Sequence, residues 1–78
     1  MPKFLVQNLS DRPVRLAIEP WADLEVMAPN GKAEFEYDEP ADIVFGVSND
    51  GAFVDIFSAH IKVTANGGEK IFTPPESW

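Results

Sequence analysis

The feature that most limits how this chain can fold is an alternation of apolar and polar residues, repeated in eight short runs. A period of two puts successive side chains on opposite faces of a β-strand, whereas an amphipathic helix needs apolar residues three or four positions apart. Each run is bounded by Pro, Gly, Asn or Asp, which favour turns. The pattern predicts an all-β fold with strands at 3–9, 13–19, 24–28, 33–38, 42–48, 52–58, 60–65 and 69–73.

The length of the chain and its lack of cysteine determine how these strands must pack. The 78 residues suit one domain, expected to span 1–78 with 74–78 as a C-terminal tail. Without disulfides, the 45% of residues that are apolar must stabilise the fold through their core. Successive hairpins that cover one another predict a small antiparallel β-sandwich of about seven or eight short strands, with a partly open β-barrel as the alternative.

Turn residues predict which strands pair. A two-residue loop at Asn30-Gly31 suits a type I′ hairpin and would place Val26 opposite Phe35 and Leu24 opposite Tyr37. A further hairpin is expected around Asn66-Gly67-Gly68.

Two other turns carry register predictions. A loop at Asp50-Gly51 would place Phe45 opposite Ile56, and a three-residue loop with a bulge is the alternative. Apolar residues on both faces of that hairpin predict a central position, covered on both sides. At the corner 19–23, the inward residue Leu16 is expected to face Val26, with Leu24 inward as well.

Acidic residues gather in one part of the chain. Six bases and 13 acids give a net charge of −7, and residues 19–42 contain eight acids against the single base Lys32. This charge argues against binding to nucleic acid or to anionic membranes. The N-terminal residues lack the pattern of a signal peptide, and no run has the length of a membrane helix, so we expect a cytoplasmic protein.

The predicted hairpins bring several of these acids together. Glu25 would face Glu36 and Asp23 would face Asp38, and like charges opposed on a ladder are unfavourable. The candidate site is therefore an acidic corner, defined as Glu19, Trp21, Asp23, Glu25, Glu36 and Asp38. Its expected role is to bind a protein partner with a basic surface. The structural alternative is a solvated outer face that opposes aggregation.

A small ligand is the second hypothesis for this corner. Glu19, Asp23 and Asp38 would converge at one end of the sheet, where carboxylates suit Ca²⁺, and a sugar could stack on Trp21. The alternative for Trp21 is that its indole folds back and caps the core, with the N–H bonded to a nearby oxygen. No cofactor is expected.

The sequence offers little for catalysis. His60 is the only histidine, and no cysteine is present to complete a zinc site. Ser58 and Asp55 lie nearby along the chain, but catalytic triads depend on geometry, so we expect a non-enzymatic protein. Asn8-Leu9-Ser10 matches a glycosylation sequon, which we interpret as a chance match.

The run NLSDRPVRLAIEPWADLEVMAPNG, from Asn8 to Gly31, resembles small uncharacterised bacterial β-sandwich proteins with a Glu-Pro-Trp corner. The resemblance covers less than a third of the chain. It implies a bacterial single-domain β-sandwich and assigns no activity or catalytic residue. Whether the protein is a monomer or a homodimer is left open, because apolar edge strands can pair two chains.

Overall fold

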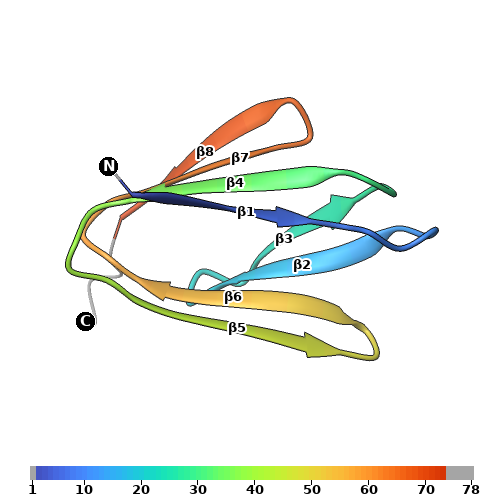
Figure 1. The fold of residues 1–78 in the computed structure, drawn as a ribbon. Helices are drawn as coiled ribbons and strands as arrows, with labels where there is room; N and C mark the ends of the chain where they lie inside the picture. Colours follow the sequence, from blue (N-terminus) through green and yellow to red (C-terminus); the bar gives the residue numbers. More distant parts are fainter. Residues whose placement is uncertain (1, 74–78) are drawn as a thin grey trace.

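The computed structural model describes residues 2–73, which form eight β-strands and no helix (Figure 1). The strands are β1 (Lys3–Gln7), β2 (Val14–Glu19), β3 (Asp23–Met27), β4 (Lys32–Tyr37), β5 (Asp42–Ser48), β6 (Gly51–Phe57), β7 (Ile61–Ala65) and β8 (Gly68–Phe72). All eight predicted strands are confirmed, with ends that differ by at most two residues. The predicted tail, 74–78, lies outside the described residues.

The strands form two four-stranded sheets that pack as the predicted sandwich. The first sheet has the order β1-β4-β7-β8, and all its neighbours are antiparallel. The second has the order β3-β2-β6-β5, and here β2 and β6 run parallel. The antiparallel prediction therefore fails at this one pair, where two hairpins, β2–β3 and β5–β6, join side by side.

The core lies between the inner faces of the two sheets. Every second residue of the central strands points inward, as the period of a strand requires. The fully buried side chains include Leu16 and Ile18 of β2, Phe35 of β4, and Val54 and Ile56 of β6. Each contributes roughly 1.5–3 kcal/mol to folding by leaving water.

The predicted hairpin at Asn30-Gly31 is wrong, although the turn itself is present. β3 pairs with β2, whereas β4 pairs with β1 and β7, so the turn carries the chain from one sheet to the other. Asn30 adopts a φ of 65°, and the Gly31 N–H donates to the Ala28 carbonyl at 2.7 Å. The backbone of Asn8 binds both Asn30 and Gly31, and these bonds hold the turn against the end of β1.

The β2–β3 hairpin is confirmed, but its predicted register is wrong by one residue. Leu16 faces Glu25 instead of Val26. Because a shift of one reverses every side chain of a strand, Leu24 and Val26 point outward, with 53% and 50% of their surface exposed. The turn before β3 includes Ala22 with a φ of 56°, a left-handed conformation that no residue type in the sequence indicates.

The β5–β6 hairpin is also confirmed, with a register that differs by two residues. Its loop is Asn49-Asp50, so Phe45 faces Val54. The predicted central position holds for β6 alone, because β5 is the edge strand of the second sheet. The predicted cover on both sides is wrong for both strands, since Phe53 of β6 and Val44 of β5 are 38% and 58% exposed on the outer face. The β7–β8 hairpin forms as predicted, with the loop Asn66-Gly67 at φ values of 52° and 76°.

Candidate functional site

The structure separates the residues of the predicted acidic corner. Because β3 and β4 lie in different sheets, the predicted oppositions of Glu25 to Glu36 and of Asp23 to Asp38 are wrong. Glu36 instead faces Lys3 on one neighbouring strand and Lys62 on the other. Asp38 follows β4, where its backbone N–H donates to the Ser58 hydroxyl at 3.1 Å.

Asp23 and Glu25 point toward the other sheet and bind a lysine there. The Lys70 ammonium lies 2.8 Å from Glu25 Oε1 and 3.0 Å from Asp23 Oδ2. The side-chain amide of Asn66 donates to Glu25 Oε2 at 3.0 Å and to the Val26 carbonyl at 3.1 Å. These contacts close the side of the sandwich between β3 and β8, which we call the sealed edge, defined as Asp23, Glu25, Asn66 and Lys70.

The sealed edge changes the titration of its lysine. Its hydrogen bond to Glu25, and to a smaller extent the one to Asp23, favours the charged ammonium, so the pKa of Lys70 is raised above its ordinary value of 10.5. The observed register, one residue from the predicted one, turns the carboxylates of Asp23 and Glu25 inward. Lys70 neutralises them at the margin of the core.

The remaining candidate ligands do not assemble a metal centre. Glu19 faces Asp55 of β6. Within residues 2–73, no three His, Cys, Asp or Glu side chains gather closely enough to hold a metal ion. Trp21 packs on Phe72 with ring centroids 4.8 Å apart, and its indole N–H donates to the Thr73 carbonyl at 2.9 Å. This is the arrangement that the capping interpretation of Trp21 predicts.

Two buried polar residues have structural partners. The Ser58 hydroxyl donates to the Asp38 carbonyl at 2.7 Å, tying the end of β4 to the segment after β6. The Asn8 amide donates to the carbonyls of Arg12 at 2.8 Å and Met27 at 3.0 Å, and its oxygen accepts from Ser10. With only 4% of Asn8 exposed, a glycan on the Asn8-Leu9-Ser10 sequence is incompatible with this fold, which agrees with its interpretation as a chance match.

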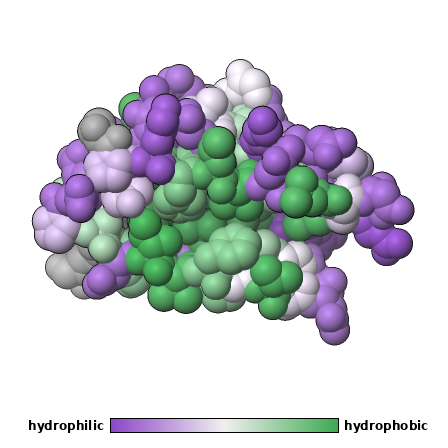
Figure 2. Space-filling view, in the orientation of Figure 1, coloured by the Kyte–Doolittle hydropathy of each residue, from purple (hydrophilic) through white to green (hydrophobic). Residues whose placement is uncertain are grey.

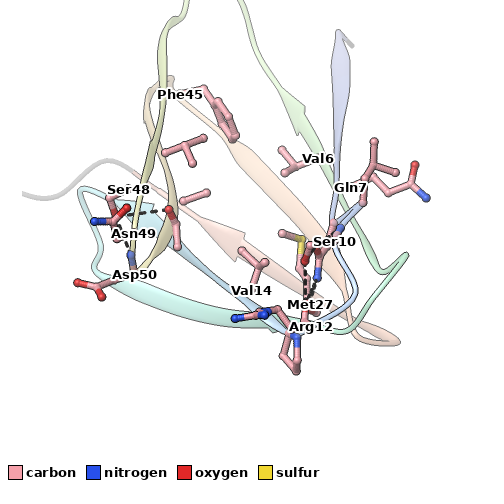
Figure 3. Close-up of a pocket in the computed structure, with 16 residues that line it drawn as sticks. Val6, Gln7, Ser10, Arg12, Val14, Met27, Phe45, Ser48, Asn49 and Asp50 are labelled. Atoms are coloured by element: carbon pink, nitrogen blue, oxygen red, sulfur yellow. Dashed lines mark hydrogen bonds between the residues drawn. The ribbon is translucent and has the colours of Figure 1, made fainter.

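The opposite side of the sandwich, between β1 and β5, is not closed in this way. A groove of about 410 Å³ runs into it between the two sheets. Figure 3 shows Val6 of β1 and Phe45 of β5 on its two sides. Met27, a core residue, and Val14, which packs against the core, also line the groove. We call this side the open edge, defined by the apolar groove residues Val6, Val14, Met27, Phe45 and Val47 together with the outer side of β5.

β5 differs from the other three edge strands. Residues 43–48 of this seven-residue strand carry no charge, whereas β3 and β8 include charged residues within the strand and β1 begins with Lys3. Val44 and Val47 are 58% and 75% exposed, and Phe45 is 52% exposed. In Figure 2, hydrophobic surface continues from the gap between the sheets down over β5, with hydrophilic residues around it. Natural sheets usually protect edges of this kind with charges or proline.

The outer face of the second sheet adds to this apolar surface. Leu24 lies beside Ala17, Ala17 beside Phe53, and Phe53 beside Gly46, which forms one row across all four strands. The Phe53 ring covers Gly46 so closely that a Cβ there would overlap it. The outer face of the first sheet is instead charged, with ion pairs between Lys3 and Glu34 and between Lys62 and Glu69.

The open edge was missed by sequence reasoning, although a signal for it exists. The run Ile43-Val44-Phe45-Gly46-Val47 contains no charge in a chain of which 24% is charged. In an uncharged run with apolar residues at odd and even positions, both faces of the strand are apolar. Such a run fits a covered central strand and an unprotected edge strand equally well. The order of strands in the sheet decides between the two, and the alternation of apolar and polar residues does not reveal that order.

No protein family, curated protein or solved structure matches this chain. The described part of the chain also includes no helix with the length and apolar character needed to cross a membrane. The implied bacterial origin and the expected cytoplasmic location stay predictions.

Proposed function

We propose that this protein is a non-enzymatic interaction module that binds an extended, apolar polypeptide segment along β5. The observation that carries the proposal is an edge strand of seven residues, uncharged from 43 to 48 and exposed on both of its faces. Alternate backbone N–H and C=O groups of any edge strand point away from the sheet, where an added strand can bind them.

The groove supports specificity for such a segment. Main-chain hydrogen bonds supply affinity in strand addition, whereas pockets for alternate side chains select the sequence. Phe45 and Val47 point into the groove from β5, on the same face as the buried Val54. A volume of about 410 Å³ accommodates apolar side chains from a bound strand.

The acidic residues near the start of β5 favour a partner segment with a basic residue at one end. Asp38, Glu39 and Asp42 lie at or just before the start of β5, so the strand begins beside three carboxylates. This keeps part of the sequence-based hypothesis, a partner with a basic surface, while moving the contact from the acidic corner to the open edge. The rest of the acidic corner is largely engaged, because Asp23 and Glu25 bind Lys70.

A peptide titration tests the proposal. A short peptide of alternating valine and threonine with a terminal lysine is added to isotope-labelled protein, and amide chemical shifts are followed by NMR. Residues 42–48 should shift in a saturable way. The matched control is the same peptide with a central proline, which lacks the N–H that a ladder needs and should bind far more weakly.

Two variants connect the binding to β5. Val47→Lys places a charge on the exposed edge and should abolish the shifts. Ile71→Lys places the same charge at a similarly exposed position on β8, 64% exposed, and should leave binding unchanged. Equal shifts with both peptides, or equal losses in both variants, would contradict binding by strand addition.

A further inference from the structure

We propose that the segment bound at the open edge belongs to a second copy of this chain, paired antiparallel along β5 around a two-fold axis. This inference rests on the proposed function, because it names the partner of the same edge. It would join the second sheets of two copies into one continuous sheet, with the two β5 strands at its centre. Two-fold pairing of this kind is self-complementary and closes without forming a filament.

The position of the axis follows from the faces of β5. Opposite residues of an antiparallel pair share a face, so a two-fold axis must pass through a residue of β5. With the axis at Phe45, each Phe45 faces its counterpart in the other copy. The other pairs are Val44 with Gly46, Ile43 with Val47, and Asp42 with Ser48.

The two neighbouring positions of the axis are worse. β5 runs from Asp42 to Ser48, so only an axis at its central residue, Phe45, pairs all seven residues of the strand. An axis at Gly46 or at Val44 pairs five of them and leaves the other two opposite residues outside the strand. The axis at Phe45 also keeps uncharged residues opposite one another from 43 to 47.

The two ends of β5 differ in the charges that surround them. The start of the strand lies beside Asp38, Glu39 and Asp42, whereas both arginines of the chain lie near its end. Arg12 lines the groove together with Ser48, and Arg15 lies next to Gly51, which faces Ser48.

Antiparallel pairing therefore sets the acidic end of each copy against the end that carries the arginines. Asp11 and Asp50 balance those arginines, so the acidic end meets a region of no net charge instead of a second acidic end. In particular, Asp42 of the second copy falls in line with Ser48, Gly51 and Arg15, with no long side chain between the carboxylate and the guanidinium. A chain of net charge −7 can thereby associate with itself at this edge.

Sedimentation equilibrium and cysteine cross-linking test the proposal on the full chain. The protein should sediment with a mass that rises with concentration toward twice the 8.6 kDa of one chain. Val47→Lys should raise the dimer dissociation constant by about tenfold or more, since it buries a charge in the pair. Arg15→Glu should raise it by roughly two- to fivefold, and Ile71→Lys should leave it unchanged.

Cross-linking locates the axis. The natural chain has no cysteine, so a single introduced thiol reports one contact. Directly opposed residues have Cα atoms at a distance that a disulfide spans, so Phe45→Cys should cross-link to itself on mild oxidation. Ile71→Cys, on the far edge of the other sheet, is the control and should form no cross-link.

The outcomes separate this inference from the proposed function. A monomer at every concentration that still binds the valine and threonine peptide at 42–48 would overturn the second copy as partner and leave the interaction module intact. A monomer that binds no peptide would overturn both. A dimer that persists in Val47→Lys, together with a Phe45→Cys variant that forms no cross-link, would place the contact elsewhere and also overturn the inference.

Discussion

The two sides of the sandwich are closed by different chemistry. Between β3 and β8, Lys70 binds Asp23 and Glu25 across the gap, and Asn66 adds hydrogen bonds to the same strand. Between β1 and β5, the corresponding gap is a groove lined by apolar side chains. The comparison shows that the two sides of one sandwich differ, because ion pairs and hydrogen bonds close the sealed edge while the open edge exposes apolar side chains.

Among the substitutions that test this comparison, removing the Asn8 amide is expected to lower the free energy of unfolding the most. Asn8→Ala leaves the carbonyls of Arg12 and Met27 without their donor at the end of the open edge. Losing the partners of buried polar groups costs about 2 kcal/mol of unfolding free energy. Urea unfolding measures the loss, with Gln7→Ala, an exposed neighbour, as the control. An equal loss in both variants would show that the Asn8 bonds add no stability.

Breaking the sealed edge is expected to have the next largest effect. Lys70→Met removes the cation from Asp23 and Glu25, whose side chains are only 24% and 12% exposed. Carboxylates that lose their partner in a partly buried site are unfavourable, so the melting temperature should fall by a few degrees.

Lys62→Met is the matched control for the sealed edge. It loses the Lys62–Glu69 pair on the outer face of the first sheet, where the two side chains are 31% and 59% exposed, and should change the melting temperature little. A smaller fall for Lys70→Met than for Lys62→Met would mean that the ion pairs of the sealed edge do not stabilise it.

Alkaline pH should weaken the sealed edge without mutation. The folded pKa of Lys70 is raised, so its stabilising contribution is complete from neutral pH up to 10.5 and is lost as the pH rises through the folded value. The stability difference between the natural chain and Lys70→Met should therefore shrink above pH 10.5. Urea midpoints measured for both proteins across this pH range test this expectation. A difference that stays constant with pH would contradict a stabilising role for the charged Lys70.

A charge at the open edge should have the smallest effect on folding. Val47 is 75% exposed, so Val47→Lys should change the unfolding free energy of the monomer by no more than about 0.5 kcal/mol. The same variant should lose association through β5. Unfolding at concentrations below dimerisation separates the two effects, and a large loss of monomer stability would show that Val47 belongs to the core.

The strands of this fold are predictable because each carries its own alternation and turn residues. Their partners are not, because the same turn chemistry serves two purposes. Asn66-Gly67 closes a hairpin, whereas Asn30-Gly31 turns the chain into the other sheet, and both asparagines adopt a left-handed conformation. What differs is the backbone of Asn8, which binds the second turn from a position distant in sequence.

The candidate site was harder to predict than the strands. The acidic corner depended on the β3–β4 hairpin and on a register in which Leu24 pointed inward, and neither exists. The sequence favoured that register because it buried apolar residues, but Lys70 gives the inward Asp23 and Glu25 a partner that lies 45 residues or more along the chain. Long-range compensation of this kind leaves no local signal.

The parallel pairing of β2 with β6 has a consequence for the order of folding. β2–β3 and β5–β6 are local hairpins, yet the second sheet is complete only when Leu16 meets Ala52, with β4 already crossing to the other sheet between them. Closing the chain over that separation costs more conformational entropy than closing a short hairpin loop. We expect a high contact order to place folding in the millisecond to second range, with the joining of the two hairpins as a late step.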